Sequence, residues 1–150
     1  MRIRADPLSR RINRMKIIQC EIPSEQLLQL ESLFRSQWTD FSFTGYSAAL
    51  PNPLVIIMQE TVIGGLSYTL FKHPNSETEV IWVNAVFVLP EYRGNALASK
   101  LIAHSILDAR QFGLKTLFTY TNVPGLYAKN GWREVDSETE PGHSVMSISL

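Results

Sequence analysis

The hydrophobic and polar positions of this chain repeat every two residues in some stretches and about every 3.6 residues in others, which indicates both strands and helices. Seven runs rich in β-branched and aromatic residues predict strands: 16–21, 54–59, 62–71, 80–89, 116–121, 132–135 and 145–150. The tight connection at Glu60 and Thr61 predicts that the second and third runs form an antiparallel hairpin. Gly64 and Gly65 inside the third run predict a bulge or a close packing contact.

Helical spacing occurs in the segments between these runs. Ser24 is a good N-cap for a helix to about Gln37, with Leu27, Leu30, Leu33 and Phe34 on one face. A second helix ends at Gly113, a natural C-cap, and its predicted core face holds Ala98, Leu101, Ile102, Ser105, Ala109 and Phe112. The irregular segment 38–50 predicts a short helix near 46–50, and 122–124 begin another that runs to about 129.

The order of these elements predicts one mixed α/β domain over residues 16–150. We expect a mostly antiparallel twisted sheet of about six to seven strands, flanked by helices. The chain has 150 residues, and 45% of them are hydrophobic, which suits one ordinary core. No apolar run approaches the length of about 20 residues that spans a bilayer, so we expect no membrane contact and a cytoplasmic setting. The single cysteine, Cys20, excludes a cysteine-based zinc cluster, and we expect no metal site.

The net charge of zero conceals a basic N-terminus. Residues 1–16 hold six of the 14 basic side chains and one of the 14 acidic ones, so the rest of the chain carries five net negative charges. The first 15 residues form a basic extension with no apolar periodicity, which predicts disorder or a translation start at Met15. An organellar presequence and a nucleic-acid tail are alternatives. The acidic remainder argues against nucleic-acid binding and favours a cationic substrate.

Residues 86–101 carry the strongest chemical signal, because a strand, a turn marked by Pro90 and a helix follow one another there. The start of a helix presents unpaired backbone N–H groups, which suit a phosphate. Small residues leave those groups uncovered, so we expect the amides of the turn and first helical residues to bind pyrophosphate: Gly94, Asn95, Ala96, Ala98 and Ser99.

Two motifs in this order resemble the GCN5-related N-acetyltransferase (GNAT) family. In VLPEYRGNALA, Arg93, Ala96 and Ala98 occupy the fixed positions of the family's cofactor motif, although the central one is usually Gly. The segment GLYAKNGW at 125–132 is similar to the family's Tyr-x-Lys-x-Gly-Phe segment, with Trp132 in place of Phe.

The resemblance implies acetyl-CoA as the co-substrate and a direct attack by an amine in a ternary complex. It implies that the strand holding Val86 and Val88 splays from its neighbour at 116–121 and pairs with the pantetheine arm. It also implies that Arg93 and Asn122 bind the cofactor. Tyr127 is implied as the general acid that protonates the leaving thiolate, since a phenol with a reference pKa of about 10 is protonated at neutral pH.

The sequence leaves several molecules open as the acceptor of the acetyl group. A small primary amine is the leading hypothesis, a peptide amine the second, and a catalytically silent acyl-CoA-binding sensor the alternative function. At the position of Trp82, relatives often carry a Glu that acts as the general base. Asn84 lies two residues further on and on the same face of the strand, so both residues are predicted to contact the substrate. Glu79 is a candidate base, followed by His73 and His143, with a water relay as the default. We also consider a homodimer through the last strands.

Overall fold

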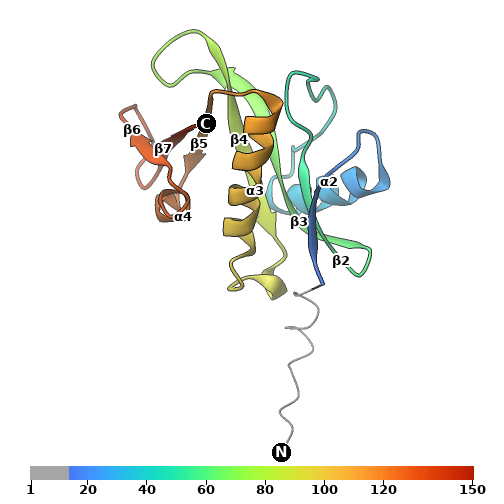
Figure 1. Cartoon of the computed structure of the whole chain (residues 1–150). Helices are drawn as coiled ribbons and strands as arrows, with labels where there is room; N and C mark the ends of the chain where they lie inside the picture. The colour runs from blue at the N-terminus through green and yellow to red at the C-terminus, as the bar shows by residue number, and fades with distance from the viewer. Residues whose placement is uncertain (1–13) are drawn as a thin grey trace, which may run out of the picture.

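The computed structural model describes residues 14–150 and shows one twisted seven-stranded sheet with helices on both faces (Figure 1). The basic N-terminal segment lies outside the described residues up to position 13. The strands are β1 (Lys16–Gln19), β2 (Leu54–Met58), β3 (Thr61–Lys72), β4 (Glu79–Val88), β5 (Thr116–Thr121), β6 (Arg133–Val135) and β7 (Ser144–Ser149). The helices are α2 (Glu25–Gln37), α3 (Leu97–Phe112) and α4 (Pro124–Ala128), with a 3-10 turn η1 (Pro90–Tyr92).

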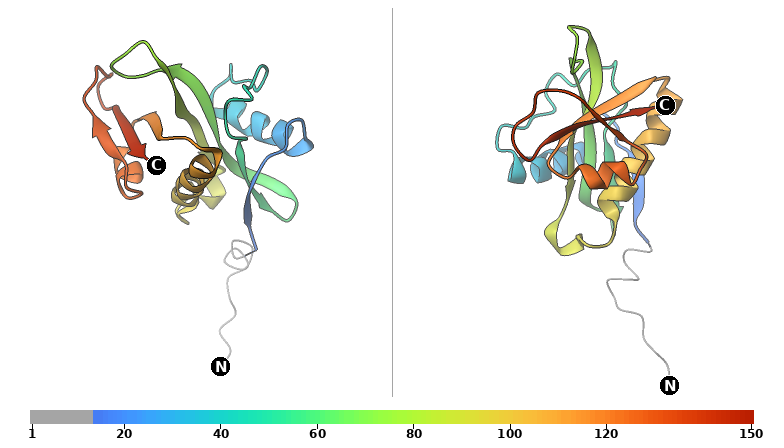
Figure 2. Two further views of the ribbon diagram at one scale, coloured as in Figure 1. Left: turned by 45° about the horizontal axis from the view of Figure 1, so that its top comes forward. Right: turned by 90° about the vertical axis from the view of Figure 1, so that its left-hand side faces the viewer.

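The strand order is β1-β2-β3-β4-β5-β7-β6, and every neighbouring pair is antiparallel except β4 and β5. Strands β6 and β7 therefore lie at the opposite end of the sheet from β1 (Figure 2). This arrangement confirms the mixed, mostly antiparallel sheet expected from the sequence. The single parallel pair, β4 with β5, lies inside the sheet rather than at its edge.

Helix α2 covers one face of the sheet. The Ser24 hydroxyl accepts a hydrogen bond from the Leu27 N–H at 3.1 Å, so Ser24 is the N-cap that the sequence predicts. Leu27, Leu30 and Phe34 of the helix are buried in one apolar cluster with residues of the sheet and of two loops: Cys20, Phe43, Val55, Val62, Ala85 and Phe87. Burial of this apolar surface is what holds α2 in place.

Helix α3 covers the opposite face of the sheet. Leu101, Ile102 and Ala109 are fully buried, and Gly113 ends the helix with a φ of 94°. The prediction that Phe112 belongs to the core face is wrong, because burial along α3 stops at Ala109 and Phe112 is 47% exposed. Helical spacing gives a residue's angular position but not how far the packed surface extends along the helix.

Two local predictions need correction. The segment 46–50 forms turns rather than a short helix, and Leu50 N–H donates to Ser47 O at 3.1 Å without a following helical turn. The β2–β3 connection consists of Gln59 and Glu60, both with positive φ (49° and 64°), instead of Glu60 and Thr61. This is the pattern of a two-residue hairpin turn, which needs a left-handed backbone at both positions.

Of the two predicted roles, Gly64 and Gly65 make the close packing contact. A bulge is also present, but its extra residue is the neighbouring Ile63, since Ile56 pairs with Gly64 and Ile57 with Val62. A Cβ at Gly64 would run into the backbone of Phe87, and one at Gly65 would run into Leu54 O and the Leu30 side chain. Both faces of β3 are therefore packed too closely there for a side chain.

Candidate active site

Strands β4 and β5 separate after a short paired stretch, as the resemblance implied. Only Trp82 with Phe118 and Val83 with Thr119 are paired in this parallel ladder, so the β5-facing edge of β4 beyond Val83 has no strand partner. A cleft of about 440 Å³ occupies the gap. Its walls come from β4, the end of β5, α3 and α4, and Trp38 and His143 also line it.

The register of β4 also shifts where this gap opens. Ser67 pairs with Ala85 and Tyr68 with Val83, so Asn84 is an extra residue, a bulge. The Ser67 hydroxyl donates to Asn84 Oδ1 at 2.7 Å and fixes its side chain. Val86 lines the cleft beyond this bulge, where backbone groups of β4 are available to a ligand.

A second cavity of about 170 Å³ lies at the start of α3 and is lined by four of the five turn and first helical residues that the sequence singled out, all except Asn95. Its lining residues are Val88, Tyr92, Arg93, Gly94, Ala96, Leu97, Ala98, Ser99, Leu126 and Lys129. Ala98 and Leu126 line this cavity and the cleft between the strands, so the two spaces adjoin. Together they form one track from the helix start to the middle of the sheet.

The start of α3 carries no side-chain cap. Gly94 and the N-cap Ala96 both have positive φ (84° and 60°), and the N-cap side chain makes no hydrogen bond to the backbone N–H groups of the first turn. The Asn95 side chain instead donates back to Tyr92 O at 3.0 Å. The N–H groups of the first helical turn, which have no intrahelical partner, are therefore left for an anion, and the helix dipole favours negative charge there.

Arg93 lines this cavity but is also part of the scaffold. Its Nε donates to Val88 O at 2.9 Å, and its guanidinium lies 5.5 Å from the centre of the Phe87 ring. These contacts close the turn between β4 and α3. Arg93 therefore fixes the shape of the turn whose amides face the cavity.

Tyr127 of α4 is buried in the cleft. Its ring meets Trp132 edge-on at 5.1 Å between centroids, and burial raises the pKa of its hydroxyl, opposed by a hydrogen bond with the Thr119 side chain. The phenol is therefore protonated at neutral pH and can donate a proton. The two aromatic residues of the second motif are therefore in contact, and Trp132 packs against the ring of Tyr127.

Asn122 is exposed and lines the cleft, but it is not a helix cap. Helix α4 begins at Pro124 with Val123 as its N-cap residue, and Val123 N–H donates to Thr121 Oγ1 at 2.9 Å. The contact with a ligand stays a prediction.

Sequence reasoning missed Asn130, which connects the two helices along the track. Its Nδ2 donates to Ser99 Oγ of α3 at 3.1 Å and to Leu126 O of α4 at 3.0 Å. An Asn directly before Gly131 indicates a turn, and nothing in the local sequence points to a bond 31 residues away.

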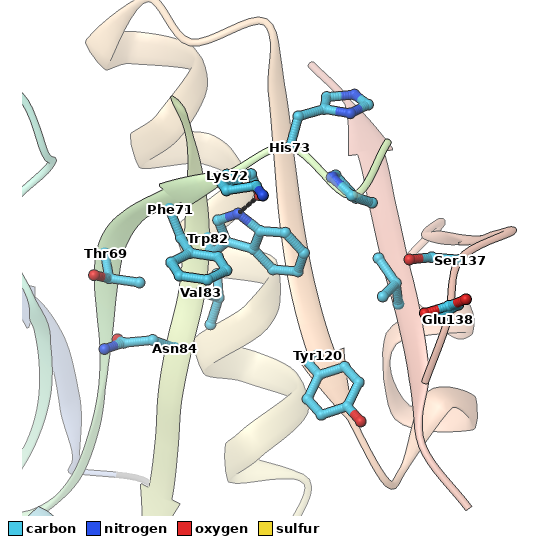
Figure 3. A pocket seen from close by; sticks show the side chains of 12 residues that line it. Thr69, Phe71, Lys72, His73, Trp82, Val83, Asn84, Tyr120, Ser137 and Glu138 are labelled. Atoms are coloured by element: carbon cyan, nitrogen blue, oxygen red, sulfur yellow. Dashed lines mark hydrogen bonds between the residues drawn. The ribbon is translucent and has the colours of Figure 1, made fainter. Parts of the chain in front are cut away.

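A third cavity of about 460 Å³ lies between the β3–β4 hairpin and the segment joining β6 to β7 (Figure 3). Phe71 and Trp82 stand on one side of it, Ser137 and Glu138 on the other, with Tyr120 near its base. The Trp82 indole N–H donates to Lys72 O at 3.1 Å. Asn84 lines this cavity and the cleft, so the bulge is where the two meet.

Glu79, the candidate base, does not join these residues. It is exposed at the first position of β4, opposite Lys72 of β3, and lines neither the cleft nor the third cavity. The carboxylate that does line the third cavity is Glu138, which forms no ion pair with any residue in the described part of the chain.

Within residues 14–150 no group of three His, Cys, Asp or Glu side chains could hold a metal ion. The helices of that part of the chain are also too short or too polar to cross a membrane.

Comparisons with known proteins agree with this geometry. The model of the acetyltransferase (GNAT) family matches residues 18–132. No curated protein matches the sequence.

Three solved structures illustrate the fold. YhbS, a GNAT N-acetyltransferase from Escherichia coli in complex with CoA, is 18% identical with a TM-score of 0.71, over 91% of this chain and 81% of that one. A GNAT acetyltransferase from Brucella melitensis in complex with acetyl-CoA is 16% identical with a TM-score of 0.67, over 91% of this chain and 88% of that one. Naa50 from Arabidopsis thaliana, in complex with the bisubstrate analogue CoA-Ac-MVNAL, is 18% identical with a TM-score of 0.65, over 91% of this chain and 99% of that one.

The splayed parallel pair and the uncapped helix beside it define the class of acyl-CoA N-acyltransferases. Because the family model covers most of its length, the chain belongs to the acetyltransferase (GNAT) family. The resemblance inferred from the two motifs is thereby confirmed, and the protein is an enzyme of the acyl-CoA N-acyltransferase type.

Proposed function

We propose that the protein transfers the acetyl group of acetyl-CoA to the primary amine of a small molecule. The observation that carries this proposal is the continuous track from the uncapped start of α3 to the gap between β4 and β5. Acetyl-CoA has a pyrophosphate at one end of a long pantetheine arm, and the track offers amides for the first and unpaired strand edge for the second.

In this arrangement the pyrophosphate lies on the amides of Gly94, Asn95, Ala96, Ala98 and Ser99. The pantetheine arm follows the free edge of β4 past Val88 and Val86, with Asn122 across the cleft. A backbone N–H near Val86 polarises the thioester carbonyl and stabilises the oxyanion of the tetrahedral intermediate.

Tyr127 supplies the proton for the leaving group. Its protonated phenol lies in the cleft, where the sulfur of a pantetheine arm in the gap would be. When the C–S bond breaks, the thiolate takes the hydroxyl proton of Tyr127 and leaves as the free thiol of CoA.

The acceptor enters from the third cavity and meets the thioester at Asn84. Phe71 is 62% exposed and Tyr120 43% exposed, so an apolar acceptor body would cover aromatic surface that is otherwise in contact with water. Aromatic faces also attract an ammonium group, and Glu138 adds a negative charge at the rim. These features favour an amine with an aromatic or other apolar body.

A small molecule is favoured over a peptide because the third cavity is bounded on its outer side. The Asn75 side chain of the β3–β4 hairpin donates to Asp136 O at 3.1 Å, which ties the hairpin to the segment after β6. Naa50 was solved with a peptide-bearing analogue, so a peptide amine is the second candidate.

The test is thiol release from acetyl-CoA with a panel of arylalkylamines, aliphatic diamines and short peptides. We expect arylalkylamines to give the highest kcat/KM. Phe71→Ala should lower that value about tenfold by removing apolar contact, while Phe112→Ala, an exposed Phe on α3 far from the cavity, should not. Preference for peptides would contradict the proposed acceptor, and acetyl-CoA binding without turnover on any amine would support the silent sensor.

A further inference from the structure

The proposed function leaves one group unassigned, the base that removes a proton from the acceptor nitrogen. An alkylamine with a reference pKa near 10.4 is almost fully protonated at pH 7, so the reaction needs a proton acceptor. The titratable side chains that line the cleft and the third cavity are Lys72, His73, Tyr120, Tyr127, Glu138 and His143. Only the two imidazoles and the Glu138 carboxylate can accept a proton at neutral pH, and of these only His143 lines the cleft that also holds Tyr127.

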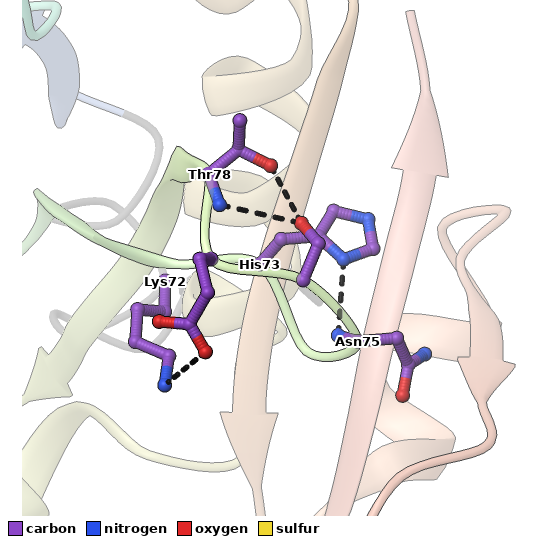
Figure 4. Close-up of polar contacts among 6 residues, drawn as sticks. Lys72, His73, Asn75 and Thr78 are labelled. Carbon is purple, nitrogen blue, oxygen red and sulfur yellow. Dashed lines mark hydrogen bonds and ion pairs between the residues drawn. The ribbon is translucent and has the colours of Figure 1, made fainter.

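The hydrogen bonding of His73 excludes it. Its Nδ1 accepts the Asn75 N–H at 3.0 Å in the polar network of the β3–β4 hairpin, next to the Lys72–Glu77 ion pair (Figure 4). A neutral imidazole has one nitrogen lone pair for hydrogen bonding, and here Asn75 occupies it. His73 therefore carries its proton on Nε2 and cannot take up another without losing this bond.

His143 has the opposite arrangement. Its Nδ1 lies 3.3 Å from Pro141 O and 4.0 Å from Glu140 Oε2. Both neighbours are acceptors, so the proton of the neutral imidazole is on Nδ1. The lone pair is then on Nε2, where it is free to accept a proton.

Neighbouring groups also fix the orientation of this imidazole. Its ring stacks on Tyr120, with centroids 5.0 Å apart and an interplanar angle of 16°. Tyr120 is itself held by Glu140, because its hydroxyl donates to Glu140 Oε2 at 3.3 Å and accepts the Glu140 N–H at 2.9 Å. A carboxylate thus positions both the ring and the surface on which the ring stacks. The side chain of His143 remains 33% exposed, so solvent can exchange its proton.

We propose that Nε2 of His143 is the general base of the reaction, with Glu140 and Tyr120 as positioning residues. This inference rests on the proposed function. His143 Nε2 first takes a proton from the ammonium form of the acceptor and passes it to solvent. The neutral amine then attacks the thioester carbon, a C–N bond forms, and the carbonyl electrons move to the oxygen. The nitrogen then gives one proton to His143 Nε2. When the oxyanion collapses, the C–S bond breaks and the sulfur takes the Tyr127 proton. Solvent returns a proton to Tyr127 and removes one from His143.

The first arm of the experiment compares the pH dependence of kcat in the wild type, His143→Gln and His104→Gln. His104 is the matched control, because it lies on α3 beside Asp108 and lines none of the cavities. We expect the activity of the wild type to fall as the pH is lowered, which gives the pH profile an acid limb, because a protonated imidazole cannot act as a base. His143→Gln should lower kcat at least 100-fold and abolish this acid limb, with the KM for acetyl-CoA unchanged. His104→Gln should keep both.

Glu140→Gln should lower kcat by a smaller factor and keep the acid limb, because the base remains but is less well oriented. An acid limb and a kcat in His143→Gln equal to those of the wild type would overturn the assignment.

A second arm does not depend on turnover. In the ¹⁵N NMR spectrum of the labelled protein, the neutral ring of His143 should carry its proton on Nδ1, and that of His73 on Nε2. A proton on Nε2 of neutral His143 would overturn the proposed base even if the enzyme is active. Absence of turnover in the wild type with every amine would instead overturn the proposed function.

Discussion

Ala96 occupies a backbone conformation that favours glycine. It has a φ of 60° at the start of α3, at the motif position where relatives usually carry Gly. The left-handed region costs a residue with a Cβ roughly 1 kcal/mol, and the chain accepts this cost because the turn must leave the first amides of α3 uncovered.

Ala96→Gly should therefore raise the free energy of unfolding by about 1 kcal/mol, measured by urea denaturation. Ala103→Gly is the control, an exposed position in the middle of the same helix, where Gly should lower stability by about 1 kcal/mol. Equal effects of the two substitutions would contradict the assigned conformation.

Tyr68 buries its hydroxyl without a hydrogen-bond partner in the described part of the chain. The nearby Ser105 hydroxyl donates to Ile102 O at 2.7 Å instead. Burial, and then the charge of Asp108, raise the pKa of Tyr68. The folded state therefore holds this proton more tightly than the unfolded chain, and the stability present below pH 10 falls as the pH rises further.

Tyr68→Phe should raise the free energy of unfolding by about 1 kcal/mol at pH 7 and reduce its decline above pH 10. Tyr46→Phe is the contrast, since the Tyr46 hydroxyl donates to Pro51 O at 2.7 Å and its loss should destabilise the protein. Urea titrations at pH 7 and pH 10.5 measure both effects. Lower stability of Tyr68→Phe at pH 7 would show that the hydroxyl has a partner.

At the scale of elements, local signals predicted most of the fold. The Ser24 cap, the Gly113 end of α3 and the bounds of β5 all depend on residues close in sequence, and all are confirmed. The errors depend on context. Phe112 lies past the packed part of α3, and the turn at Gln59 and Glu60 adopts positive φ without a glycine.

Helices α3 and α4 line the proposed acetyl-CoA track, and the side chain of Asn130 connects them. Asn130→Asp keeps the size of the side chain but removes the Nδ2 donors to Ser99 and Leu126 O. We expect it to reduce the thermal stabilisation by saturating acetyl-CoA to less than half of the wild-type shift. For a ligand at 100 times its Kd, that wild-type shift corresponds to about 2.7 kcal/mol.

Asn75→Asp is the matched control for this prediction. Its side-chain amide also donates to a backbone carbonyl, but it does so in the β3–β4 hairpin, away from α3. It should leave the acetyl-CoA shift unchanged. A full shift in Asn130→Asp would show that the two helices do not need this bond.

At the scale of the whole molecule, the proposed function assigns the two substrates to two adjoining spaces. The proposed donor track runs along the α3 and α4 side, the proposed acceptor cavity lies by Trp82 and Tyr120, and Asn84 lines both where β4 and β5 part. A cleft that joins both spaces allows an amine to attack the thioester directly, with no intermediate on the enzyme.

The sequence predicted the donor half of the proposed site better than the acceptor half, and the reason is where their residues lie along the chain. The donor half lies on contiguous residues, the turn and first helical turn around 93–99, so a sequence motif can represent it. The acceptor half joins Phe71, Trp82, Tyr120 and Glu138 from four separate segments. Even its key feature, the bulge at Asn84, depends on pairing with β3 rather than on any local pattern.

The most direct test of this account is to follow N-acetylation of an arylalkylamine by mass spectrometry, with saturating acetyl-CoA, in the wild type and in Tyr127→Phe. The wild type should form the acetylated amine. Tyr127→Phe should form it at least 100-fold more slowly with the same affinity for acetyl-CoA, because the cleft keeps its shape and loses only the acid. No acetylated amine from the wild type, or an unchanged rate in Tyr127→Phe, would contradict the account.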